Sequence, residues 1–408
     1  MKNIKFRLIV MNFLQYGVWG AWLISLGAYL GGGLHFTGVQ IGSFFATMGI
    51  ASLFMPALMG VVADRWIPAQ RLLGILHLLS AACMTYAATQ TEYMALYTAV
   101  LLGVIFYMPT ISLSNTVAYN ALNRNGLDTV KDFPPIRVWG TVGFICSMIA
   151  VDLLGLAKGS GQLYFSASLG LLLGLYSSSL PQCDVSKKQS TGNWVDALGL
   201  RAFALFKERR MAIFFIFSMF LGVSLQITNA FANDYLTNYF GGIEEYNGTF
   251  GVEHANILIS LSQLSETLCI LLIPFFLKRY GIKNVMLISM LAWVLRFALL
   301  GLGDPGTGVW MLILSMIVYG VAFDFFNISG SLYVEKETAP EIRASAQGVF
   351  MMMTNGFGAT IGSYAAGKVV DMYGWPNSWY IFAAYALVVA ILFAIIFRYK
   401  HTPETAKA

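Results

Sequence analysis

The stretch Val318-Tyr-Gly-Val-Ala-Phe-Asp324-Phe-Phe-Asn327-Ile-Ser-Gly-Ser331 places a carboxyl and an amide in the middle of an apolar run from about Val309 to Val334. A run of this length can cross a bilayer, because about 20 helical residues cover the hydrocarbon core. An acid at that depth costs roughly 2.5 to 3.5 kcal/mol and is functional by default, so we expect Asp324 to face protein or water. The alternative interpretation is a structural hydrogen bond to a neighbouring helix.

The composition around this stretch is that of a polytopic membrane protein. Of the 408 residues, 57% are hydrophobic and 11% are charged, against about 25% charged in a typical soluble domain. Mean hydropathy is +0.68. The pattern predicts an all-α protein with twelve apolar spans, at about 8–33, 41–62, 72–89, 94–121, 136–156, 161–180, 211–236, 255–277, 284–302, 309–334, 345–367 and 376–397.

The placement of basic residues predicts the topology. If the N-terminus is cytoplasmic, all of the 25 Lys and Arg residues fall on the inner side except Lys158, Lys368 and Arg296. The positive-inside rule therefore favours twelve spans with both termini in the cytoplasm. The net charge of +5 follows from this topology, so no nucleic-acid partner is expected.

One long inner connection, Pro181 to Arg210, divides the spans six and six. It predicts an N-terminal bundle over 1–180, a cytoplasmic loop over 181–210 and a C-terminal bundle with a short tail over 211–408. The two halves contain similar stretches at corresponding positions, since Pro134-Pro-Ile-Arg137 and Pro340-Glu-Ile-Arg343 each lie at the start of corresponding spans. Two pseudo-symmetric six-helix bundles of the major facilitator type are expected, with a site between them near the midplane.

The loop after the second span contains Gly60-Val-Val-Ala-Asp64-Arg65. It resembles the Gly-x-x-x-Asp-Arg signature of the major facilitator superfamily. We expect it to act as a gate, in which the Asp64 carboxylate pairs with a cation or a helix N-terminus in one state and releases it in the other. The equivalent loop, Lys278 to Lys283, lacks the acid, so the gate is expected to be asymmetric. The alternative is that these residues serve only the positive-inside rule.

Polar side chains inside the spans recur at helical spacing and must turn away from lipid. The candidate substrate-binding residues on these stripes are Arg137, Thr141, Phe144, Gln226, Asn229, Gln263, Glu266, Tyr319, Phe323 and Asp324. Amides and carboxylates bind hydroxyls and base edges, and aromatic rings cover flat faces. Because Arg137 is the one cation expected in the cavity, a neutral, polar, ring-containing solute is favoured.

Two acids, Glu266 and Asp324, are expected near the midplane of second-half spans. Burial favours the protonated form of a carboxyl group, so at least one of them can bind and release a proton as access alternates. The proton is the predicted coupling ion, although sodium coupling is an open alternative. Arg296 and Asp152 also lie within or near the membrane, and neither is assigned to the site.

Several stretches together resemble the bacterial nucleoside:proton symporters of the major facilitator superfamily. The resemblance implies uptake of purine and pyrimidine nucleosides with protons across the bacterial inner membrane, and a pocket at the ten candidate residues. The stretches are Asp132-Phe-Pro-Pro-Ile-Arg-Val-Trp-Gly-Thr-Val-Gly-Phe144, Leu225-Gln-Ile-Thr-Asn229, Ser262-Gln-Leu-Ser-Glu-Thr267, Ser315 through Ser331 and Arg343-Ala-Ser-Ala-Gln-Gly348.

Other functions are less well supported by the sequence. A transporter of another neutral polar solute, such as a sugar, is the principal alternative, and a channel would show no saturation. An intramembrane enzyme is disfavoured, because Gly362-Ser-Tyr-Ala-Ala-Gly367-Lys368 is followed by Val369 where a phosphate loop needs Ser or Thr. The four cysteines are scattered and predict neither a disulfide nor a metal site. No cofactor other than the proton is expected, and the chain is expected to act as a monomer.

Overall fold

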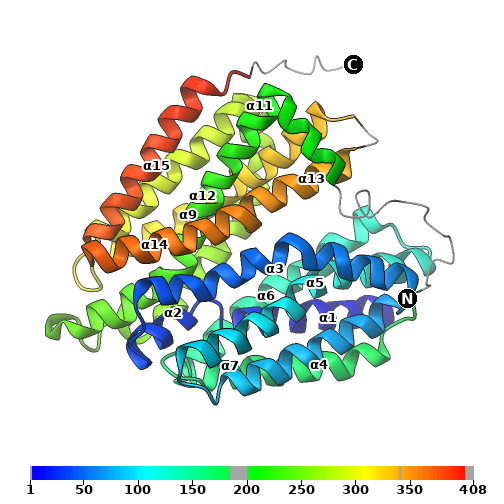
Figure 1. Cartoon of the computed structure of the whole chain (residues 1–408), viewed down its shortest axis with the longest axis horizontal. Coiled ribbons are helices and arrows are strands. Elements are labelled where there is room, and N and C mark those ends of the chain that lie inside the picture. Colours follow the sequence, from blue (N-terminus) through cyan, green and yellow to red (C-terminus); the bar gives the residue numbers. More distant parts are fainter. Residues whose placement is uncertain (1, 184–199, 340–341, 400–408) are drawn as a thin grey trace. The chain divides into compact units, whose positions relative to one another are not determined.

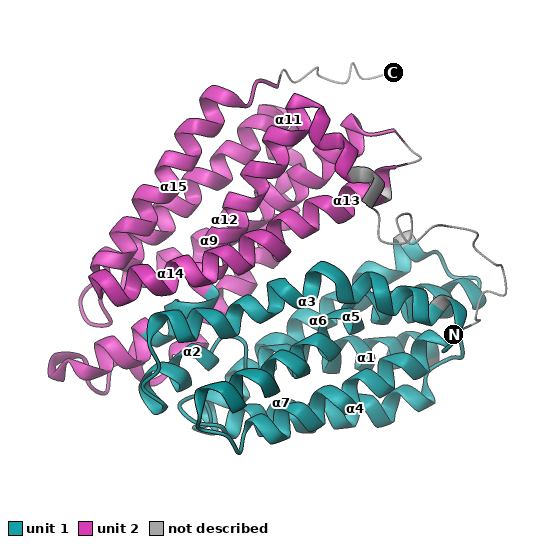
Figure 2. Ribbon diagram, viewed as in Figure 1, with its two compact units in different colours: residues 1–198, 229–234 teal, residues 199–228, 235–408 magenta. Residues whose placement is uncertain are grey.

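Helices make up all the regular structure in the described part of the chain, which covers residues 2–183, 200–339 and 342–399 of a computed structural model (Figure 1). This confirms the all-α expectation. The chain divides into two compact units (Figure 2). Unit 1 comprises Met1–Leu198 with Asn229–Asp234, and unit 2 comprises Gly199–Thr228 with Tyr235–Ala408.

Unit 1 is built from helices, two of which begin at side chains that cap their first turn. Thr37 caps one helix in a reciprocal capping box with Gln40, and the Glu92 carboxylate accepts a hydrogen bond from the Ala95 amide at 2.9 Å. The helices are α1 (Lys2–Gly20), α2 (Leu26–Ala28), the π-helical η1 (Tyr29–Gly33), α3 (Gly38–Arg65), α4 (Ala69–Ala87), α5 (Tyr93–Arg124), α6 (Thr129–Leu153), α7 (Gly161–Tyr176) and the short η2 (Ser177–Ser179).

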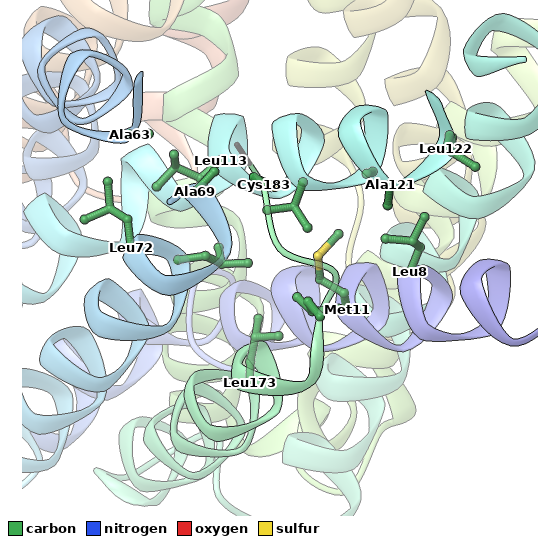
Figure 3. Close-up of a cluster of buried hydrophobic side chains, with 14 of the residues drawn as sticks. Leu8, Met11, Ala63, Ala69, Leu72, Leu113, Ala121, Leu122, Leu173 and Cys183 are labelled. Atoms are coloured by element: carbon green, nitrogen blue, oxygen red, sulfur yellow. The ribbon is translucent and has the colours of Figure 1, made fainter. Parts of the chain in front are cut away.

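The core of unit 1 joins α1 to its neighbours. Leu8 and Met11 on α1 belong to a buried apolar cluster with residues of α4, α5 and α7, among them Leu72, Leu113 and Leu173 (Figure 3). On another side α1 packs tightly on α6, because a Cβ on Gly143 would clash with the carbonyl oxygen of Phe13. Small residues of this kind allow helices to approach closely within a membrane.

Unit 2 has a similar sequence of helices. They are the 3₁₀ segment η3 (Leu200–Lys207), α9 (Arg209–Asp234, whose last six residues fall in unit 1), the π-helical η4 (Tyr235–Tyr239), the short η5 (Phe240–Gly242), η6 (Glu244–Tyr246) and α10 (Phe250–Glu253), then α11 (Ala255–Leu302), α12 (Val309–Glu337), α13 (Arg343–Met351), the π-helical η7 (Met352–Gly358), α14 (Ala359–Tyr373) and α15 (Asn377–Ile396).

The long helix α11 contains a sharp break. Gly281 has φ 76° and ψ 167°, a conformation that glycine adopts and other residues avoid. The break separates a first limb, 255–280, from a second limb, 282–302. Both limbs pack against α12, and a buried cluster unites Cys269 and Ile273 of the first limb, Val285 of the second and Phe325 of α12. The two limbs thus form a hairpin that holds α12.

Seven helices of the described part are long and apolar enough to cross a membrane. They include α12, which contains the stretch quoted first, and α11, which covers two of the spans expected from the sequence. One detail differs from the expectation, because the predicted span 8–33 is interrupted after Gly20. The predicted connection between spans 255–277 and 284–302 coincides with the break at Gly281. Residues 184–199 of the predicted inner loop lie outside the described residues.

The break at Gly281 can be tested by substitution. Gly281→Ala puts a Cβ on a backbone that only glycine adopts readily, so we expect a cost of about 1–3 kcal/mol and a lower melting temperature of the purified protein. The matched control is Gly348→Ala, because a Cβ there meets open space and the backbone is helical. Equal melting temperatures of the two variants would show that the break is not held by this conformation.

Candidate functional site

Asp324 lies in the middle of α12 and is 3% exposed. Its Oδ2 atom has no hydrogen-bond partner among the described residues. A buried polar atom without a partner costs free energy, so such atoms in a native structure call for an explanation. The structural hydrogen bond that the sequence left open is therefore not formed at this oxygen.

The environment of Asp324 is set by serines of α11 that bind the α12 backbone. In the first limb, the Ser265 hydroxyl donates to the carbonyl oxygen of Ile317, and in the second limb the Ser289 hydroxyl donates to that of Ala322. A Cβ on Gly320 would clash with the backbone of Ser265, which shows how closely the first limb approaches. Both limbs are thereby fixed against the turns of α12 that precede Asp324.

This packing brings Glu266 of the first limb close to Asp324. Glu266 follows Ser265 directly and is half-buried. The two carboxyls act on each other electrostatically, and both act on the Tyr319 hydroxyl. Unit 2 therefore joins two of the predicted acids and one predicted aromatic residue in a single cluster.

Aromatic rings cover the neighbouring turns of α12. The rings of Tyr319 and Phe323 stack with centroids 5.8 Å apart and an interplanar angle of 15°. The Trp293 ring of the second limb meets Tyr319 edge-on at 6.0 Å, and its Nε1 has no partner among the described residues. Trp293, which the sequence did not single out, thus adds a third ring and an unused donor.

The remaining predicted residues of unit 2 are amides. Gln226 on α9 is 6% exposed, and its Oε1 has no hydrogen-bond partner in the part of the chain that the structure describes. Gln263 lies on α11 one turn before Glu266 and is half-buried. A cavity of about 10 Å³ reaches Phe323, Asn327 and Asn355. It has room for about one water molecule and is too small for a drug-sized ligand.

Unit 1 contains a second group of predicted residues on α6. The Arg137 guanidinium lies over the Tyr16 ring of α1, 3.8 Å from its centroid. Phe144 meets Trp19 edge-on with centroids 6.3 Å apart. Thr141, between them on α6, is half-buried. Asn229, although it follows Gln226 on α9, belongs to unit 1.

A buried hydrogen-bond network behind Trp19 was missed by the sequence reasoning. The Gln15 side-chain amide donates to the Thr110 hydroxyl at 2.7 Å, and the Gln15 Oε1 lies 2.8 Å from Nε2 of the fully buried His77. The Tyr107 hydroxyl donates to the Gln15 carbonyl at 2.7 Å. Gln15 lies within a predicted span, three residues after Asn12 and four before Trp19, whereas His77 is a single polar residue in an apolar stretch and gives no signal of its own.

The predicted gate lies at the end of α3. Gly60 and Arg65 are helical residues of α3, and the side chain of Asp64 lies outside the described residues. Two ion pairs near helix ends were not predicted. Lys5 pairs with Asp132 at 2.7 Å in unit 1, and Arg343 pairs with Glu335 at 2.8 Å in unit 2.

These features define a helical membrane transport protein of the major facilitator type, with acids and aromatic rings inside apolar helices. The family described as nucleoside H+ symporter matches residues 1–402. The chain belongs to this family, which confirms the resemblance seen in the sequence.

Individual relatives are similar over nearly their whole length. The chain is 52% identical to the nucleoside permease NupG of Escherichia coli, covering 98% of this chain and 97% of the relative. It is 50% identical to the xanthosine permease of Escherichia coli, covering 99% and 98%. The crystal structure of the nucleoside transporter NupG superposes with a TM-score of 0.92 at 51% identity, covering 98% of this chain and 100% of that one.

The network around Gln15 yields a stability prediction. Gln15→Leu removes the partner of His77 Nε2 in a fully buried place, and a buried polar group left unpaired costs about 1–3 kcal/mol. We expect a lower melting temperature than for the wild type. Gln90→Leu, in the turn after α4, is the control, since the Gln90 amide donates to the hydroxyl of the neighbouring, exposed Thr89. A Gln15→Leu protein as stable as the control would contradict the network's role.

Proposed function

We propose that this protein imports purine and pyrimidine nucleosides together with protons by alternating access. Membership of the nucleoside H+ symporter family favours nucleosides over the sugar alternative. It also makes the chain a transporter rather than an enzyme. The observation that carries the proposal at the level of the site is the buried acid Asp324, coupled to Glu266 and placed beside the stacked rings of Tyr319 and Phe323.

The proposed architecture has twelve membrane spans in two six-helix bundles, with both termini in the cytoplasm of a bacterium and the protein in its inner membrane. The bundles would be residues 1–180 and 211–408, joined by the loop 181–210, and the chain would act as a monomer. The placement of basic residues supports this topology. A repeated local feature supports two related halves, because a π-helical segment, Tyr29–Gly33, comes after α1 and α2, and another, Tyr235–Tyr239, comes after α9.

The proposed binding residues have roles that follow from their chemistry. Gln226, Asn229 and Gln263 would hydrogen-bond the base or the ribose, as their amides both donate and accept. Phe144, Tyr319 and Phe323 would stack on the base. The unpartnered Oε1 of the buried Gln226 supports such a role, because a bound solute would supply its missing hydrogen bond. Arg137 and Thr141 would make polar contacts from α6.

Glu266 and Asp324 would bind the ribose and carry the coupling proton. Two acids that interact in a site of low dielectric cannot both be ionised cheaply. One of them is therefore a natural proton acceptor when the site opens to the more acidic side. At a membrane potential of roughly 100 mV one inward proton supplies about 2.3 kcal/mol, enough for about a fifty-fold solute gradient.

The end of α3 from Gly60 to Arg65 would act as an inner gate. An acid beside a basic residue at the end of α3 can form a charge pair in one state of the cycle and release it in the other. We place Asp64 in this role from the sequence signature.

Uptake of labelled uridine and adenosine into proteoliposomes tests the coupling. We expect Asp324→Asn to abolish accumulation, so that about a fifty-fold gradient collapses toward equal concentrations. We expect Glu266→Gln to reduce accumulation less strongly. Exchange of internal for external uridine should persist in Asp324→Asn, because the amide resembles the protonated acid.

The control is Asp371→Asn, which removes an exposed acid of α14. A protonophore should abolish accumulation by the wild type and by this control. Full accumulation by the double variant Asp324→Asn, Glu266→Gln, or accumulation that a protonophore leaves unchanged, would refute proton coupling through these acids. Sodium dependence in its place would support the other coupling ion.

A further inference from the structure

Arg296 is a buried cation in the second limb of α11 that the proposed function does not yet use. It is 2% exposed and is the sole charged residue between Lys283 and Asp304. A charge at this depth is costly and normally has a specific partner. Its side chain therefore has to be explained by the groups around it.

The guanidinium of Arg296 is held by the start of α12. Its Nη1 donates to the carbonyl oxygen of Ser315 at 2.5 Å, and the Ser315 hydroxyl donates back to the Arg296 carbonyl at 3.1 Å. The Sδ of Met316 lies 3.9 Å from both terminal nitrogens. No carboxylate is within ion-pair distance of Arg296 in the described residues, and its Nε has no partner there. The charge is thus fixed in place but not neutralised by contact.

The guanidinium also lies over the Tyr319 ring. The Arg296 Cζ lies 4.8 Å from the centroid of this ring, within the range of a cation–π interaction. Tyr319 in turn stacks on Phe323 and contacts Trp293. Arg296 therefore fixes the orientation of the first ring in the aromatic group proposed to hold the base.

The same geometry places one positive and two potentially negative groups around one phenol. The Tyr319 hydroxyl is within electrostatic range of Glu266, Arg296 and Asp324. In a medium of low dielectric, charges interact over longer distances than in water. A fixed cation therefore offsets one ionised carboxyl, while two ionised carboxyls would leave the cluster with a net negative charge.

We propose that Arg296 is a positioning residue of the transport site, which orients Tyr319 for the substrate and balances the charge of one of the two carboxyls. The proposal rests on the proposed function, because it concerns the same site. Arg296 acts through Tyr319 and the field at the acids and has no direct contact with the solute.

The other titratable groups around the acids are few. Cys269 of the first limb interacts with Asp324. On α15, which packs against α11, the Tyr380 hydroxyl donates to Gly301 O and the Tyr385 hydroxyl to Phe220 O, each at 2.8 Å. Both hydroxyls are already engaged with backbone carbonyls, and among the described residues the cation beside Tyr319 is Arg296.

Uridine binding to the purified full-length protein in detergent, measured by calorimetry between pH 5 and 9, tests this role. Arg296→Met keeps the length of the side chain and removes the charge. We expect binding about tenfold weaker, in the range of a buried cation–π contact. Binding that needs a protonated carboxyl falls as the pH rises. We expect the pH at which it has fallen by half to be higher in Arg296→Met, because carboxyls without a nearby cation hold their proton more firmly.

Two further variants separate the two parts of the role. Arg296→Lys keeps the charge and should retain the wild-type pH dependence with weaker binding, since Lys lacks the planar fork. In a double-mutant cycle, Arg296→Met should weaken binding much less when Tyr319→Leu is already present. Arg279→Met is the matched control and should bind as the wild type does, because it removes an exposed cation–π contact with Tyr280, 5.6 Å from the ring centroid.

The outcomes distinguish this inference from the proposed function. Wild-type affinity and pH dependence in Arg296→Met, or fully additive losses with Tyr319→Leu, would overturn the inference. Absence of uridine binding by the wild type at every pH would instead overturn the proposed function. If Arg296→Met elutes as an aggregate on size exclusion, the cycle is run with Arg296→Lys. Coupling to Tyr319 would then support the inference, and its absence would overturn it.

Discussion

The packing of α11 on α12 in unit 2 has to accommodate the Asp324 carboxyl group inside apolar helices. The run from Val309 to Glu337 is helical throughout, so its backbone is satisfied internally and only its polar side chains need partners. Serines of α11 bind the α12 carbonyls of Ile317 and Ala322, and Ser315 of α12 binds back to α11. These bonds fix α12 without using the Asp324 carboxyl. One oxygen of this acid is left without a partner in the described residues, which keeps it available for a proton or a solute.

The break at Gly281 makes this arrangement possible. Because α11 breaks at this residue, both of its limbs pack on α12, as the cluster of Cys269, Ile273, Val285 and Phe325 shows. The first limb contributes the acid Glu266 and the second contributes the cation Arg296 and the ring of Trp293. Opposite charges are therefore brought to Tyr319 from two limbs of one chain segment. A single backbone conformation at one glycine thus determines which charges surround the aromatic group.

Part of this could be predicted from the sequence, and the limits have physical causes. Asp324 and Glu266 stood out because acids inside apolar runs are rare, and Tyr319 and Phe323 because they share a helical face with Asn327. Arg296 was equally rare, but long basic side chains can reach the membrane surface, so the sequence alone gave no reason to place it beside Tyr319. That contact joins two helices and depends on the fold.

The same limit explains the groups missed in unit 1. A tyrosine such as Tyr16 in an apolar span is ordinary, and its contact with Arg137 arises only when α1 packs on α6. The helix pattern was predictable from hydropathy, whereas the interruption after Gly20 and the single-residue break at Gly281, with helix on both sides of it, were not. Both depend on tertiary packing rather than on local composition.

Each unit places a guanidinium against a tyrosine ring, and this has a consequence for selectivity. Arg137 lies on Tyr16, and Arg296 lies on Tyr319 with one nitrogen bonded to a carbonyl. A guanidinium binds phosphate best when its planar fork is free to form two parallel hydrogen bonds. Both guanidinium groups contact aromatic rings, and that of Arg296 also donates to a backbone carbonyl, while Glu266 and Asp324 lie within electrostatic range of the same Tyr319. Under the proposed function, the Arg296 guanidinium of unit 2 is therefore poorly placed to bind a phosphate group through two parallel hydrogen bonds, which is consistent with an uncharged nucleoside as the substrate.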